Sequence, residues 1–144
     1  MTVDIQKSIL SSLYTTLTAD TTLKAAMGGT VRLYPVWAEV DAEFPYLVNK
    51  LDLRGTEFFP NQTGTYLVDI WSDSTNAEET LAIRKRIVEL LDELQFDTTE
   101  AVNGKIWKQT DGFIPETTPG IWHYTIQFNI RFYRKSETGV IIGR

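Results

Sequence analysis

The sequence predicts an α+β fold, with one domain in which a mostly antiparallel or mixed β-sheet carries helices packed on one face. Two patterns support this prediction. In two segments, near the start of the chain and in its middle, apolar residues recur every three or four positions, which is typical of amphipathic helices. Elsewhere, apolar and polar residues alternate in short runs separated by glycine, proline and asparagine, which is typical of strands and turns. The predicted order of elements is α-α-β-β-β-α-β-β.

Two helices are predicted before the first strand. Asp20 has the side chain of an N-cap for the second, short helix. Gly28-Gly29 is expected to end that helix, because glycine accepts the left-handed conformation of a helix C-terminus. The first helix is predicted from apolar residues that lie four positions apart and form one stripe: Ile5, Ile9, Leu13 and Leu17.

The middle helix is predicted to begin with a capping box. In that motif Thr75 and Glu78 would each satisfy a free backbone N–H group of the other. The helix is expected to place on the core the apolar stripe Ile83, Ile87, Leu90 and Leu94.

Five strands are predicted from short runs of β-branched and aromatic residues, at positions 31–35, 45–53, 65–71, 105–110 and 122–133. Loops are expected at 36–44, 54–63 and 111–120, where acidic residues, proline and glycine gather. The last strand has the clearest pattern, since six apolar residues at a period of two should share one face on the core. They are Trp122, Tyr124, Ile126, Phe128, Ile130 and Phe132.

Composition and charge exclude several classes of protein. The 144 residues include no cysteine, so disulfides, thiolate catalysis and cysteine zinc sites are ruled out. The formal net charge of −5 argues against general nucleic-acid binding, which needs a basic face. No apolar run approaches the roughly 18–20 residues that cross a bilayer. The segment Met1–Lys7 lacks the pattern of a signal peptide, so we expect a protein that is made and used in a cytoplasm or leaves it by a route other than secretion.

No arrangement of residues predicts an enzyme, a cofactor or a metal site. His123 is the single histidine, and it lies on the polar side of the last strand. It is either a general base or, as we favour, a histidine that faces solvent or a neighbouring side chain. Three alternating acids, Glu39, Asp41 and Glu43, lack the fixed spacing and central glycine of a calcium loop, so we interpret them as a solvated acidic loop.

Two features suggest contacts with other proteins. Phe58 and Phe59 stand next to proline and asparagine in a predicted loop, and two large apolar rings must be buried somewhere. Either that loop folds back on its own domain or it docks on a partner. The end of the chain is basic within an otherwise acidic protein. Candidate interface residues are therefore Phe58, Phe59, Arg131, Arg134 and Lys135.

Short motifs along residues 5–133 also resemble a known family. The most specific are Tyr34-Pro35, Phe44-Pro45-Tyr46 and Val68-Asp69-Ile70-Trp71, which are followed by a helix and by a closing aromatic strand that ends in Phe132-Tyr133. In this order they resemble the tail-terminator, or tail-completion, proteins of long-tailed phages and prophages, including the lambda tail terminator. Each motif is a pattern of core and turn residues, and none is a catalytic signature.

The resemblance implies a structural virion protein. Members of this family form hexameric rings that cap the head-proximal end of the tail tube, stop its polymerisation and provide the surface for head–tail joining. The implied partners are further copies of the chain, the tail tube protein and the head-side connector, with DNA passing through the ring without sequence-specific contacts. The implied location is the virion tail, after assembly in the host cytoplasm, with no membrane involved.

The resemblance divides the chain into a tail-terminator-like domain at 1–135 and a flexible tail at 136–144. Two other functions stay open at this point. One is another component of the head–tail junction, such as a stopper or an adaptor. The other is a small, non-viral ligand-binding α+β domain.

Overall fold

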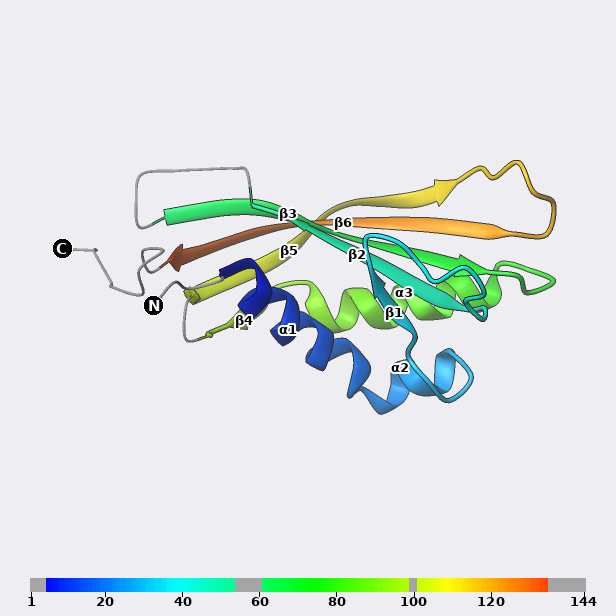
Figure 1. Ribbon diagram of the computed structural model, residues 1–144, viewed down its shortest axis with the longest axis horizontal. Helices are drawn as coiled ribbons and strands as arrows, with labels where there is room; N and C mark the ends of the chain where they lie inside the picture. The colour runs from blue at the N-terminus through cyan, green and yellow to red at the C-terminus, as the bar shows by residue number, and fades with distance from the viewer. Residues whose placement is uncertain (1–4, 54–60, 99–100, 135–144) are drawn as a thin grey trace.

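A single six-stranded sheet forms the body of the protein, with three helices on one of its faces (Figure 1). The computed structural model describes residues 5–53, 61–98 and 101–134. Helix content and strand content together confirm the α+β class. In chain order, the elements are α1 (Ile5–Thr18), α2 (Thr21–Ala26), β1 (Leu33–Pro35), β2 (Tyr46–Asp52), β3 (Asn61–Ser72), α3 (Glu78–Leu91), β4 (Leu94–Phe96), β5 (Ala101–Ile114) and β6 (Trp122–Arg134).

The strands lie in the order β1-β2-β3-β6-β5-β4. Among the described strands, only β1 and β2 pair in parallel, and the other neighbouring strands pair in antiparallel fashion. The three longest strands, β3, β6 and β5, lie side by side and carry the sheet beyond the helices (Figure 1). The mixed, mostly antiparallel sheet with helices on one face is therefore as the sequence predicts.

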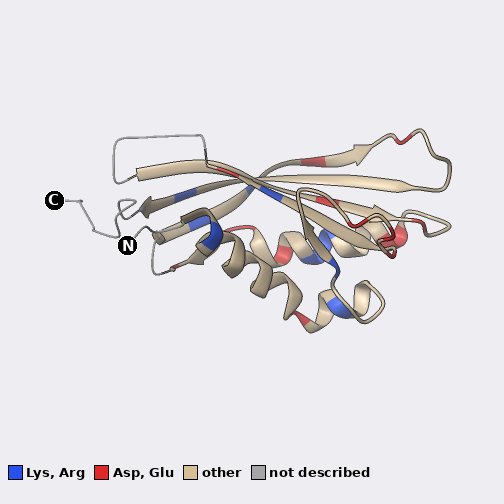
Figure 2. Cartoon of the chain, in the orientation of Figure 1, with Lys and Arg blue, Asp and Glu red and all other residues tan. Residues whose placement is uncertain are grey.

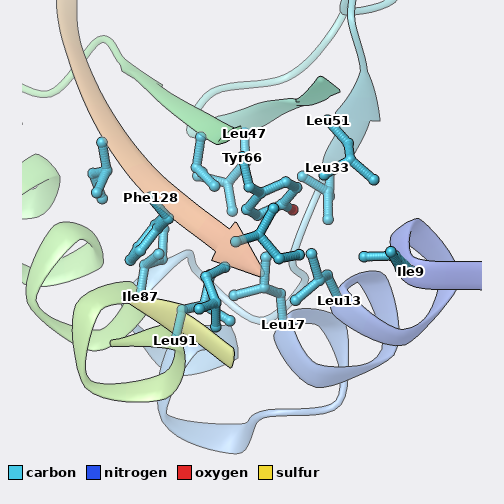
Figure 3. Packing of buried hydrophobic residues seen from close by; sticks show 14 of the residues in the cluster. Ile9, Leu13, Leu17, Leu33, Leu47, Leu51, Tyr66, Ile87, Leu91 and Phe128 are labelled. Atoms are coloured by element: carbon cyan, nitrogen blue, oxygen red, sulfur yellow. The ribbon is translucent and has the colours of Figure 1, made fainter. Parts of the chain in front are cut away.

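The core lies between the sheet and the helices (Figure 3). All four residues of the predicted α1 stripe are buried, and they pack towards the aromatic residues of the sheet centre. Tyr66 on β3 and Phe128 on β6 are fully buried, with their ring centroids 6.4 Å apart. The Tyr66 hydroxyl accepts a hydrogen bond from Asn49 Nδ2 at 2.7 Å, so this polar group is satisfied within the core.

The predicted ends of α2 are confirmed. Asp20 is its N-cap, and its carboxylate accepts a hydrogen bond from the Leu23 N–H at 2.8 Å. The same carboxylate pairs with Arg86 of α3 at 2.7 Å, which joins the two helices. Gly28 and Gly29 follow the helix with φ angles of 82° and 114°, values that favour glycine.

The middle helix differs from its prediction at both ends. The capping box is wrong, because Ala77 is the N-cap and the Asn76 side chain accepts from the Glu78 N–H at 2.9 Å. Leu94 lies in β4, a strand that the predicted order lacks. The helix ends at its C-cap Asp92, and the next residue, Glu93, has a φ of 63° that turns the chain away from the helix. The buried stripe of α3 consists of Thr80, Ile83, Ile87 and Leu91.

The long strands also extend into predicted loops. Residues 61–63 belong to β3 and residues 111–114 belong to β5, although all of them were predicted to lie in loops. On β6, five of the six residues assigned to the core are buried, but Trp122 is only half-buried. Its indole N–H donates to the Ser74 carbonyl at 3.0 Å, near the end of the sheet. Within the described ranges, no helix has the length and apolar character needed to span a bilayer.

Candidate assembly surfaces

The face of the sheet that points away from the helices is the first candidate surface. Alternate residues of β2, β3 and β6 point to this face, and their side chains are mostly half-buried rather than fully exposed. Aromatic and polar side chains are mixed there, whereas the opposite face is almost entirely apolar. Its central rows include Tyr46, Leu67, Asp69, Trp71, His123, Thr125, Gln127, Asn129 and Arg131.

His123 is the centre of a compact cluster on this face. Its ring stacks on Trp71 of the neighbouring strand, with centroids 3.8 Å apart and an interplanar angle of 15°. Nδ1 lies 2.7 Å from Glu116 Oε1 in the β5–β6 connection. Nε2 lies 3.3 Å from Asp69 Oδ1 without good hydrogen-bond geometry, so this contact is mainly electrostatic. Tyr46 stacks on the other side of Trp71, with centroids 6.2 Å apart.

The carboxylates of Asp69 and Glu116 favour the protonated form of His123. Burial disfavours the imidazolium, but Asp69 and Glu116 outweigh that effect and raise the pKa of His123 above 6.5. Burial also disfavours ionised Asp69, yet its contacts with His123 and Thr125 lower the pKa of the Asp69 carboxyl. The cluster therefore holds the β5–β6 connection against β3. Among the described residues, no group of three or more histidine or acidic side chains is arranged to hold a metal ion.

A groove at the opposite end of the sheet has a basic lining. Its volume is about 660 Å³, and a β-bulge between Val102 and Lys105 disturbs the strand pairing beside it. Lys105 and Arg131 are register partners on β5 and β6 and bring two positive charges to it. The residues that line it are Glu93, Asn103, Lys105, Trp107, Arg131, Phe132 and Tyr133.

The connection between β1 and β2, residues 36–44, is acidic and carries apolar side chains in solvent. Trp37 is 82% exposed and Val40 is fully exposed, in a loop that also contains Glu39, Asp41 and Glu43. Figure 2 shows acidic segments in this loop and at the end of the molecule where β5 turns into β6, while basic and acidic segments are mixed in the middle and towards the other end. The end where β5 turns into β6 is therefore the more acidic end of the sheet.

The structure describes only part of the predicted interface. Phe58, Phe59 and Lys135 lie outside the described residues. Arg134 ends β6, where its backbone pairs with Ala101. Arg131 is exposed on the face without helices. Sequence reasoning missed Trp37 and Val40, although one signal was present, because large apolar residues alternating with acids have no neighbours in the loop to bury them.

Comparisons with known proteins support the fold but not a family. No protein-family model matches the chain, and no curated protein is significantly similar to it in sequence. A solved chain described as "Virion of native gene transfer agent (GTA) particle" has a TM-score of 0.73 and 13% identity, covering 90% of this chain and 97% of that chain. Another solved chain, whose name states no function, has a TM-score of 0.61 and 11% identity, covering 93% of this chain and all of that chain. At these identities the chain is similar to both in fold.

Proposed function

We propose that this protein is a structural subunit of a phage-like virion, and that it caps the head-proximal end of a tail tube as a hexameric ring. The observation that carries the proposal is the fold, which is similar over nearly the whole length of both chains to a chain of a gene transfer agent virion. The sequence motifs that resemble tail terminators favour the same class of protein. The proposed role at the end of the tail tube rests on that resemblance.

The surfaces suit a ring. A closed ring needs two different patches on each subunit, which meet head to tail around a rotation axis. This chain has an acidic loop with exposed apolar side chains beside the edge strand β1, and a basic groove on β5 and β6. Opposite charges on separate patches favour ordered association of identical subunits.

The proposed role is not enzymatic. His123 is the single histidine, and in this structure its ring is stacked on Trp71 and held between two carboxylates that join β3 to the β5–β6 connection. Those contacts describe a structural residue. The proposed partners are further copies of the chain, the tail tube protein and the head-side connector, and the DNA passes through the ring.

The proposal is tested by measuring the mass of the purified protein with and without tail tubes. We expect a closed ring, at least at tube ends, visible by electron microscopy. A protein that stays monomeric in the presence of tubes contradicts the proposal. Tails of normal length that lack heads when the protein is missing would instead indicate a stopper or an adaptor, whereas overlong tails indicate a terminator.

Phe58 and Phe59 remain proposed contacts of the ring or of the tube. Changing both to serine should weaken the ring or its hold on the tube, because aromatic side chains dominate interface energies. Tails assembled with this variant should be overlong or headless in electron micrographs. Normal tails that join heads efficiently would remove these two residues from the interface.

A further inference from the structure

We propose that Trp37 and Val40 of one subunit dock into the basic groove, lined by Lys105, Trp107 and Arg131, of a second copy of this chain. This contact rests on the proposed ring and specifies how neighbouring subunits meet. The loop supplies an apolar tip surrounded by acids, and the groove supplies aromatic walls with two cations.

The loop is held at both ends, so its tip is presented rather than free to collapse. At its start, the Val36 N–H donates to the Asn49 carbonyl at 2.8 Å, and Val36 adopts a φ of 63°, which is strained for a β-branched residue. At its end, the Arg32 guanidinium donates to the carbonyls of three consecutive residues at 3.1–3.2 Å: Glu43, Phe44 and Pro45. A tip fixed in this way loses little entropy on binding.

Trp37 projects into solvent from this fixed frame. Its N–H donates to the Pro35 carbonyl at 2.6 Å, which places the residue immediately beside the end of β1. Its side chain is nevertheless 82% exposed, and Val40 is exposed completely. A tryptophan in such a setting has the character of a binding anchor, since tryptophan is enriched among residues that dominate interface energies.

The groove matches this tip in chemistry. Trp107 and Tyr133 offer aromatic surface, while Lys105 and Arg131 place positive charge against the three acids of the loop. Glu93 also lines the groove, so its lining carries both signs with an excess of positive charge. A loop with Glu39, Asp41 and Glu43 is therefore the complementary partner.

The loop and the groove of one chain are too far apart to meet. β1 and β5 are separated by four strand spacings, about 19 Å. Along the strands, the register places Arg131 five residues beyond Ile126, which lies in the row of Val68 and Asn49, and this adds about 17 Å. Since Trp37 is fixed close to Pro35, it cannot reach the groove of its own chain, and the proposed contact therefore joins two copies.

The test measures assembly by mass photometry and sedimentation, alone and with tail tubes, for the full chain and for Trp37→Ser. Loss of the indole should weaken assembly at least tenfold while the thermal melt of the subunit stays unchanged. The matched control is Tyr14→Ser, which removes another exposed aromatic residue from α1 and should leave assembly intact. An equal loss in both variants would show a nonspecific effect and overturn the contact.

A charge swap tests the pairing itself. Lys105→Glu should weaken assembly, and combining it with Glu39→Lys should restore it at least in part, because each subunit then offers reversed charges to its neighbours. Assembly of Trp37→Ser equal to that of the wild type, together with no rescue in the swap, would overturn this contact while leaving the ring in place. A wild-type protein that never assembles, even with tubes, would overturn both proposals.

Discussion

Alternate residues of β6 form its two faces, and the two faces are stabilised in different ways. On the helix side, Ile126, Phe128 and Ile130 are completely buried under the helices. On the other side, Thr125, Gln127 and Asn129 are half-buried by their neighbours on the sheet alone. One face is held by burial of apolar area, and the other by stacking and charge contacts such as those of His123. The first face therefore stabilises the subunit, while the second is available for other contacts.

The largest expected effect follows from removing an aromatic ring from the helix side. Phe128→Ala should lower the free energy of unfolding by about 3–5 kcal/mol, because it leaves a cavity in a fully buried position. Asn129→Ala, the next residue on the other face, should change it by less than about 1 kcal/mol. Urea denaturation of both variants measures the difference. Equal losses would show that the two faces do not differ in the way described.

A glycine on the helix side gives the next effect. Gly64 on β3 leaves room for Leu53 and for the backbone carbonyl of Asp52, and a Cβ atom there would collide with both. Gly64→Ala should therefore cost about 1–3 kcal/mol through overpacking. Thr63→Ala, which alters the opposite face of the same strand, is the control and should cost less. A neutral Gly64→Ala in denaturation experiments would show that this part of the sheet is loosely packed.

The helix layer itself depends on Asp20, which caps α2 and pairs with Arg86. The hydrogen bond from Arg86 lowers the pKa of Asp20 from 3.8 to about 2, and the carboxylate is near the surface. Asp20→Ala should cost about 1 kcal/mol for the cap, and less than about 1 kcal/mol more for the ion pair. Asp20→Asn keeps a capping oxygen and removes only the ion pair.

These variants also have a pH signature. Because the folded pKa of Asp20 is lowered, its ion pair stabilises the protein above pH 3.8, and this stabilisation is lost as the pH falls towards 2. The stability difference between wild type and Asp20→Asn, measured by thermal melts, should shrink over that range. A difference that is independent of pH there would contradict the assigned role of Arg86.

The sequence predicts the helix side of the sheet well, because burial there follows residue type. A period of two along β6 and a spacing of four along α1 mark their buried residues directly. The strand β4 was missed because Leu94 continues the helical spacing from Leu90, and only the left-handed backbone at Glu93 turns the chain away. The full length of β5 was missed because Asp111 and Gly112 have the character of turn residues.

The other side of the sheet depends on register, which periodicity does not reveal. Trp71 meets His123 only because β3 and β6 pair at those two positions, which are 52 residues apart. Asp69 reaches the same histidine from the same strand, and Glu116 comes from a connection predicted simply as a loop. The sequence indicated that His123 faces either solvent or a neighbouring side chain. In the structure it packs against Trp71, Asp69 and Glu116. Likewise, the loop that carries Trp37 is anchored by Arg32 and Asn49, which lie outside it, so the alternation of apolar residues with acids indicates exposure but not the position of the loop.

The smallest expected effect concerns the charge of His123. Its folded pKa is raised above 6.5 by Asp69 and Glu116 despite burial, so the protonated form contributes stability that is fully present below about pH 6.5. That contribution is lost as the pH rises through the folded pKa. His123→Gln removes the titrating group. The stability advantage of the wild type over this variant, measured by urea denaturation, should therefore be larger at pH 6 than at pH 9.

Assembly provides the second measurement for this variant. Because His123 is assigned a structural role, His123→Gln should assemble within a few-fold of the wild type at a pH where both are folded. Within the subunit, its contacts join β3, β6 and the β5–β6 connection. If the stability difference between the wild type and His123→Gln did not change with pH, the ion pairs of His123 with Asp69 and Glu116 would not contribute to stability. Loss of assembly in a normally folded variant would give His123 a direct part in the contacts between subunits, and each subunit would then bind its neighbours through this cluster as well as through Trp37.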